Sequence, residues 1–293
     1  MTTIRIIVAA TDFSPGSDAA VQRAVQLARA HGASLRLLHT FDVGAWHSLK
    51  GVFAAQRFVT DPPPDVRVKQ RLTELAQALA AQTGLKVEAH FSVGSADSAI
   101  SAYVAGHETS LVVMGSRAQP EMPGLGSTAL KVLRAPACPI LIVRQAQGGP
   151  YQTLLCAIDL HAGSVRAATA AIALFPAARQ HLVHAVHPAM EWALWLNHVA
   201  REQVPTLLQA MHAQALEKLD ALARDLTRLA EHRVEAEVVH GVPALAIVER
   251  AASLGADCVA VGHHSQDALA GQLLGSMAQH LLHHSLSDVL VVP

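Results

Sequence analysis

The chain is poor in aromatic residues, charged residues and cysteines. Of its 293 residues, 4% are aromatic, 15% are charged, and the three cysteines, Cys138, Cys156 and Cys258, are scattered. So few cysteines exclude a disulfide framework and a four-cysteine zinc site. The 23 acidic and 22 basic residues leave a net charge of −1, so the cationic field that holds a nucleic-acid backbone is missing and no nucleic-acid partner is expected. No apolar run approaches the roughly 20 residues that span a bilayer, so no membrane partner is expected either.

What the chain has in abundance is apolar residues, which make up 51% of the sequence and can fill sizeable cores. The length suits two domains of roughly 150 residues each. The first residues lead straight into a strand-like run with no visible secretory signal. We therefore expect a cytoplasmic protein.

The sequence repeats itself once. An apolar run ends at Asp12, a second one ends at Asp159, and the two aspartates are 147 residues apart. The same offset relates three further pairs, and an offset of 149 relates two later ones: Leu35 and Leu182, Gly94 and Gly241, Gly115 and Gly262, then Gly126 and Gly275, Val143 and Val292. A duplicated domain that lost two residues between Gly115 and Gly126 explains this pattern. The predicted domains are 1–146 and 151–293, with Gln145–Pro150 as the linker.

Each copy alternates short apolar runs with amphipathic helical patterns. In the first copy the expected strands are 4–10, 34–39, 86–92, 110–114 and 139–143, and a helix is expected near 17–31. Because several runs are apolar on both faces, they suit a parallel sheet covered by helices. The prediction is α/β: two tandem doubly wound, Rossmann-like domains, each with a five-stranded mostly parallel sheet. In such a sheet the carboxyl ends of the strands form one edge, here called the rim, where ligands bind.

Polar residues and glycines gather at the rim of both copies. A Gly-Ser step at a helix start offers free backbone N–H groups, a hydroxyl and the positive end of the helix dipole, which together suit a phosphate. An aspartate at the end of the first strand can accept hydrogen bonds from a ribose or a base. The alternative interpretation is that these glycines and serines only make turns and caps, and that the aspartate caps the following helix.

The two copies also resemble a known family. Residues 7–17 resemble the opening of universal stress proteins. The end of each copy is similar to theirs as well, with a strand ending in glycine, a loop, a Gly-Ser step and an apolar last strand. The resemblance covers nearly the whole chain, twice, and is to the tandem-domain type. It implies a five-stranded doubly wound sheet, dimers through the last strand and, in nucleotide-binding members, bound ATP.

In those members the ATP motif is glycine, two residues, glycine, nine residues, glycine, then serine or threonine. The second copy fits its spacing, but Ser265 replaces the middle glycine. The first copy has Ala118 there, and its loop is two residues shorter. The resemblance thus favours the second copy, with Asp159 at the ribose or adenine and the other residues at the phosphates. The candidate nucleotide-binding residues are Asp159, Gly262, Ser265, Gly275 and Ser276, followed by Asp12, Gly115, Arg117, Gly126 and Ser127 in the first copy.

Histidines suggest an alternative ligand. Thirteen of the 18 lie in residues 151–293, and several map to the second rim. A zinc ion there would be held by Asp159, His161, His240 and His263. A simpler interpretation is that these are ordinary surface histidines. Slow ATP hydrolysis is a third hypothesis, although the sequence shows no general base with a paired orienting group, so binding is expected rather than fast catalysis.

The last strand of each copy, 139–143 and 288–292, would be an apolar open edge if it had no partner. The resemblance implies that two such strands pair, which within one chain gives an intrachain pseudo-dimer; a homodimer of these units is a further option. The segment 44–64 is long for a connection, and a lid or a partner surface are both open interpretations. The function expected from the sequence is that of a cytoplasmic universal stress protein that binds an adenine nucleotide for stress response.

Overall fold

The computed structural model describes residues 4–42, 44, 62–117, 124–144, 149–187, 203–263 and 274–293. The predictions for Ser265, for the linker 145–148 and for most of the segment 44–64 fall outside these residues. The chain divides into two compact units, Thr3–Gly148 and Gly149–Pro293, called here the N-terminal and C-terminal units.

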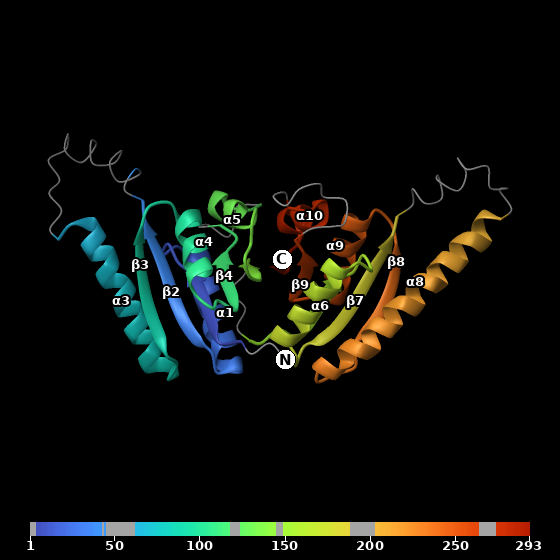
Figure 1. Ribbon diagram of the computed structural model, residues 1–293, viewed down its shortest axis with the longest axis horizontal. Helices are drawn as coiled ribbons and strands as arrows, with labels where there is room; N and C mark the ends of the chain where they lie inside the picture. Colours follow the sequence, from blue (N-terminus) through green and yellow to red (C-terminus); the bar gives the residue numbers. More distant parts are fainter. Residues whose placement is uncertain are drawn as a thin grey trace. The chain divides into compact units, whose positions relative to one another are not determined.

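The N-terminal unit is a parallel sheet with helices between consecutive strands (Figure 1). Its described elements are β1 (Ile6–Ala10), α1 (Pro15–His31), β2 (Ser34–Phe41), α3 (Pro64–Thr83), β3 (Val87–Val93), α4 (Ala96–Gly106), β4 (Leu111–Gly115), α5 (Ser127–Val132) and β5 (Ile140–Val143). The strand order β3-β2-β1-β4-β5 reverses direction at β1. Right-handed crossovers therefore place α1 and α3 on one face and α4 and α5 on the other. An ion pair of 3.6 Å between Lys131 and Asp97 joins α5 to α4.

The C-terminal unit repeats this plan with the strand order β10-β9-β6-β7-β8. Its described elements are β6 (Thr153–Ala157), α6 (Ala162–Leu174), β7 (Arg179–Val186), α8 (Val204–Leu226), the short 3-10 helix η1 (Thr227–Leu229), β8 (Glu235–His240), α9 (Pro243–Leu254), β9 (Cys258–Gly262), α10 (Ser276–His284) and β10 (Asp288–Val292). In Figure 1, α3 runs along β3 and α8 runs along β8. The predicted fold class, two tandem doubly wound domains with five mostly parallel strands each, is confirmed.

Burial on both faces explains the continuous apolar runs. All four residues of β5 and all five of β10 are buried. Helix α1 begins where the Ser14 hydroxyl accepts a hydrogen bond from the Ser17 amide, and it ends at Gly32, whose φ of 61° suits glycine. The capping residues and the buried apolar runs thus favour the same helices and strands. Together they place the carboxyl ends of β1 and β4 beside the start of α1.

One predicted landmark of the repeat is wrong. Ala9 of β1 lies opposite Leu37, whereas its counterpart Cys156 of β6 lies opposite Leu182. The counterpart of Leu182 is therefore Leu37, not Leu35, and the offset at the second strand is 145. The cause is the helix before the second strand of each unit. Helix α6 is shorter than α1, because it ends at Leu174, just before Pro176, and the loop after it restores only part of the missing length.

Within the described ranges, no helix is both long enough and apolar enough to cross a membrane. The predicted pairing of the two last strands, and with it the pseudo-dimer and the homodimer, stays a prediction.

Candidate functional site

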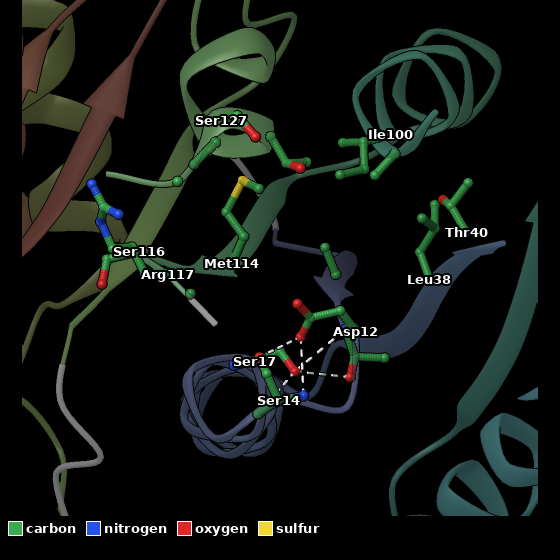
Figure 2. A pocket seen from close by; sticks show the side chains of 17 residues that line it. Asp12, Ser14, Ser17, Leu38, Thr40, Ile100, Met114, Ser116, Arg117 and Ser127 are labelled. Carbon is green, nitrogen blue, oxygen red and sulfur yellow. Dashed lines mark hydrogen bonds between the residues drawn. The ribbon is translucent and has the colours of Figure 1, made fainter. Parts of the chain in front are cut away.

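A cavity of about 310 Å³ lies at the rim of the N-terminal unit (Figure 2). It is walled by the ends of β1, β2 and β4 and by the starts of α1, α4 and α5. All five candidate residues of the first copy line it: Asp12, Gly115, Arg117, Gly126 and Ser127. Figure 2 shows Asp12 and Ser14 on one side of the cavity and Ser127 on the opposite side, with Met114 between them. The structure thus brings together residues that are more than 100 positions apart in the sequence.

Asp12 is held by a tight turn at the end of β1. One carboxylate oxygen, Oδ1, accepts a hydrogen bond of 3.0 Å from the Ser14 amide and another from the Ser14 hydroxyl. Neither of these two bonds from Ser14 involves the other oxygen, Oδ2. Burial raises the pKa of Asp12, but the hydrogen bonds from Ser14 and Ser17 outweigh it and leave the pKa below its ordinary value. The side chain is therefore a carboxylate at neutral pH. Asp12 does not cap α1, because the N-cap is Ser14; Oδ1 of Asp12 instead holds the Ser14 amide in the turn before the helix.

Two polar atoms of the N-terminal cavity are shielded from solvent without a hydrogen-bond partner. They are the Thr40 hydroxyl oxygen and the Nε of Arg117, and both residues line the cavity. In the view of Figure 2 they lie on opposite sides of it. Buried polar groups are nearly always hydrogen-bonded in folded proteins, so two unpartnered ones in a single cavity are unusual.

Gly115 lines the cavity, but its glycine has a structural cause. A Cβ at this position would lie 2.6 Å from the carbonyl oxygen of Gly16, at the start of α1. No real side chain tolerates that distance, so the absent side chain lets α1 pack closely against β4. Packing alone therefore requires a glycine here, and the predicted role of Gly115 in nucleotide binding stays a prediction.

The C-terminal unit has a smaller cavity, about 210 Å³, at the equivalent place. Four of the five candidates of the second copy line it: Asp159, Gly262, Gly275 and Ser276. The fifth, Ser265, lies outside the described residues. Asp159 repeats the arrangement of Asp12, since Oδ1 accepts hydrogen bonds from the His161 amide at 2.9 Å and from the Ser164 hydroxyl at 2.5 Å.

The backbone after each aspartate is strained in the same way. Phe13 and Leu160, which occupy equivalent positions, have φ values of 61° and 64°. Burial raises the pKa of Asp159, but hydrogen bonds from Ser164 and His161 and the nearby His161 ring lower it overall. Left-handed backbone in residues other than glycine persists only where surrounding contacts hold it, and it is typical of functional loops. The repeated turn presents an ionised aspartate to the cavity of each unit.

Sequence reasoning missed His184. Its Nδ1 lies 2.8 Å from the Ile158 carbonyl oxygen, which can only accept, so Nδ1 carries the hydrogen and Nε2 is left as an acceptor. The side chain lines the C-terminal cavity. Its counterpart, His39, makes the same bond of 2.8 Å to the Thr11 carbonyl. The corrected offset of 145 is the signal that relates the two histidines.

His39 is used differently from His184. Its ring lies beside that of Phe13, with centroids 4.9 Å apart, and beside that of Phe91, with centroids 6.3 Å apart. Burial lowers the pKa of His39, although its bond to the Thr11 carbonyl and the charge of Asp12 oppose that shift. Leu160 and Val238 replace the two phenylalanines in the C-terminal unit, so no aromatic ring at either position encloses His184.

The alternative zinc site is not formed. Among the described residues, no group of three or more histidines, cysteines, aspartates and glutamates is placed to hold a metal ion, and all four predicted ligands belong to those residues. His240 instead stacks on His212 of α8, with ring centroids 5.1 Å apart, while His161, His240 and His263 do not line the cavity that contains Asp159. The prediction failed because it placed residues at the rim without the direction of their side chains.

The cysteines take no part in either cavity. All three are buried, and burial raises the pKa of Cys138 and of Cys156 to about 12. A thiol of such a high pKa stays protonated at neutral pH and is a poor nucleophile.

The sequence of each unit matches a known protein family. The model described as "Universal stress protein family" matches residues 3–144 and again residues 150–293. The chain belongs to the universal stress protein family. No curated protein sequence matches the chain.

Solved structures of universal stress proteins have the same fold. The crystal structure of a universal stress protein from Archaeoglobus fulgidus is 17% identical, with a TM-score of 0.68, and the alignment covers 100% of this chain and 99% of that one. A putative universal stress protein from Pseudomonas aeruginosa is 20% identical, with a TM-score of 0.63 and coverage of 99% and 93%. At these identities the likeness shows the tandem fold of the universal stress proteins.

Proposed function

We propose that this universal stress protein binds an adenine nucleotide in the N-terminal cavity, and that it acts in a cytoplasmic stress response by binding rather than by fast catalysis. The observation that supports this most strongly is the pair of shielded, unpartnered groups, the Thr40 hydroxyl and the Arg117 Nε. Both donate hydrogen bonds, and Arg117 is permanently charged. A ligand that offers anionic oxygen acceptors satisfies both.

The other lining groups agree with a nucleotide. Arg117 and Ser127 lie on the same side of the cavity in Figure 2, where phosphate oxygens would be held by a guanidinium and a hydroxyl. Asp12 lies on the opposite side of the cavity from Ser127, and its carboxylate suits a ribose hydroxyl. Adenine is taken from the resemblance of residues 115–127 to the ATP motif of the family, with the departures described above.

The choice of the N-terminal unit rests on its geometry. Its cavity of about 310 Å³ reaches the range usual for small-molecule sites, whereas that of the C-terminal unit, about 210 Å³, does not. Spacing along the sequence favoured the second copy, but spacing carries no information about shielded donors. The Ala185 side chain stands where the N-terminal unit has the Thr40 hydroxyl.

Equilibrium dialysis of the full chain with labelled ATP tests the proposal. Arg117→Met keeps much of the aliphatic stem and removes the charge, and we expect the affinity for ATP to fall by about 10- to 100-fold, since hydrogen bonds to charged groups have this strength. Arg134→Met is the matched control, because Arg134 is exposed, does not line the cavity and carries the same charge.

Affinity within twofold of the unmodified chain in Arg134→Met, together with the loss in Arg117→Met, would support the site. The proposal is wrong if the unmodified chain binds no ATP, or if Arg117→Met binds it as tightly as Arg134→Met does.

A further inference from the structure

Two histidines of the C-terminal unit bring their ring nitrogens together away from its cavity. His212 lies on α8, and His240 is the last residue of β8, the strand along which α8 runs (Figure 1). Nδ1 of His212 lies 3.1 Å from Nε2 of His240, and the two ring planes differ by 10°. Neither residue lines the C-terminal cavity. The pair is therefore separate from the candidate ligand site of this unit.

The distance between the two nitrogens fits two ligands of one metal ion. A hydrogen bond between two ring nitrogens requires that one of them accept through a free lone pair. At a metal–nitrogen distance of about 2.0–2.1 Å, two nitrogen ligands lie about 2.9 Å apart at a right angle and about 3.3 Å apart in a tetrahedron. The observed 3.1 Å lies between these values. A metal ion can thus replace the shared hydrogen without separating the two nitrogens.

The surroundings of the pair are suitable for such an ion. His240 is exposed and His212 is half-buried, so water can complete the coordination shell. Residues 204–216, the first turns of α8, contain no lysine or arginine, so this stretch places no fixed positive charge beside a cation. Imidazole nitrogens combined with oxygen ligands suit Cu²⁺ and Ni²⁺, and of the divalent first-row metals Cu²⁺ binds a given site most tightly.

The N-terminal unit lacks this pair. Val93 pairs with the last residue of β2, as His240 pairs with the last residue of β7, so the two are counterparts. Helix α3, which occupies the position of α8 in the N-terminal unit, contains no histidine. The fold that the two units share therefore requires neither histidine.

We infer that His212 and His240 bind a divalent copper ion, with water molecules as its remaining ligands. Binding joins α8 to β8 and releases to solvent the hydrogen that the two rings share. The site has only His240 in common with the predicted zinc site. It uses two protein ligands, in keeping with the absence of a three-ligand group from the part of the chain that the structure describes. The inference goes beyond the proposed function and does not depend on it.

Titration of the full chain with Cu²⁺ alone, followed by calorimetry and by electron paramagnetic resonance, tests the inference. We expect one site that is tighter than the rest and has the spectral signature of two imidazole nitrogens. His212→Gln and His240→Gln should each weaken this site by at least about tenfold, because even the loss of a metal ligand's hydrogen-bond partner costs that much. The double variant should lose no more than either single variant, since one imidazole alone does not chelate.

Two further variants are controls. His232→Gln is the matched one, because His232 is exposed in the C-terminal unit and does not belong to the pair. His284→Gln removes the competing two-histidine site on α10, where the rings of His280 and His284 have centroids 4.3 Å apart. We expect the tightest site to keep its affinity within about twofold in both. A thermal melt without metal, close to that of the unmodified chain, shows that each variant is folded.

The inference is overturned if the chain has no such site, if His212→Gln and His240→Gln bind Cu²⁺ as tightly as His232→Gln, or if His284→Gln loses the site instead. Losses that add up in the double variant would also contradict it, because they would place the two histidines in different sites. The proposed function is judged separately, by whether ATP binds and depends on Arg117.

Discussion

The two units share a fold but not the chemistry of their rims. Both hold an ionised aspartate in the same strained turn, as the φ values of Phe13 and Leu160 show. They differ in what faces it, since Thr40 and Arg117 offer unpartnered donors in one cavity, while His184 offers an acceptor in the other. Duplication has preserved the turn after the first strand of each unit, and the side chains that face it have diverged.

The largest effect is expected on stability, at Gly115, where close packing requires a glycine. Gly115→Ala places a Cβ 2.6 Å from the Gly16 carbonyl oxygen, and we expect it to lower the free energy of unfolding of the N-terminal unit by about 1–3 kcal/mol. Urea unfolding followed by circular dichroism measures the change. Gly106→Ala is the control, because a Cβ there meets nothing within 4 Å. Equal stability of the two variants would contradict the packing role.

The next effect concerns the shielded hydroxyl that only the N-terminal cavity has. Thr40→Val keeps the shape and removes the donor, and we expect ATP to bind about three- to tenfold more weakly without loss of stability. Thr109→Val is a close control, because the Thr109 hydroxyl oxygen is also buried and unpartnered but lies outside the cavity. If both variants bind ATP equally well, the Thr40 hydroxyl has no role in binding.

A smaller effect on stability is expected from the two aspartates that the units have in common, Asp12 and Asp159. The folded-state pKa values of Asp12 and Asp159 lie below the ordinary 3.8, so each carboxylate stabilises the fold above that pH. This contribution is lost as the pH falls through the lowered folded-state values. We expect the unfolding free energy of the unmodified chain to drop between neutral pH and about pH 3 more steeply than that of Asp12→Asn or Asp159→Asn. The curve of Asp225→Asn, in which an exposed aspartate of α8 is changed, should follow that of the unmodified chain; parallel curves for all four would refute the stabilising role.

The smallest effect is local to His39. Burial lowers the pKa of this histidine, and Phe91 is one of the two rings beside it. Phe91→Val copies the C-terminal unit, in which Val238 lies at this position. We expect an NMR titration to show the His39 pKa moving up toward 6.5. An unchanged or lower pKa would show that Phe91 does not shield the ring.

Much of the fold was predictable because the repeat and the apolar periodicity are long-range signals that agree. The ranges expected for the first-copy strands differ from the observed ones by only a few residues at their ends, and the aspartates and the Gly-Ser steps do meet in one cavity per unit. The second strands of the two copies were misaligned by two residues. Pro176 limits the length of the helix before the strand, and the glycines used to align the copies do not reveal that difference.

The site was less predictable, since its chemistry depends on side-chain direction. Nothing in the sequence distinguishes a histidine that lies beside two phenylalanines, His39, from one that lines a cavity, His184. The same limit explains the zinc prediction, in which His240 was placed at the rim but stacks on His212. Shielding of the Thr40 hydroxyl likewise depends on contacts that only a folded chain provides.

The most direct test of the difference between the units is the number of ATP molecules bound per chain at saturation, measured by native mass spectrometry on the full chain. We expect one ATP per chain, lost in Arg117→Met and retained in Asp159→Asn. Two ATP molecules per chain, or a single one that disappears in Asp159→Asn and persists in Arg117→Met, would contradict it.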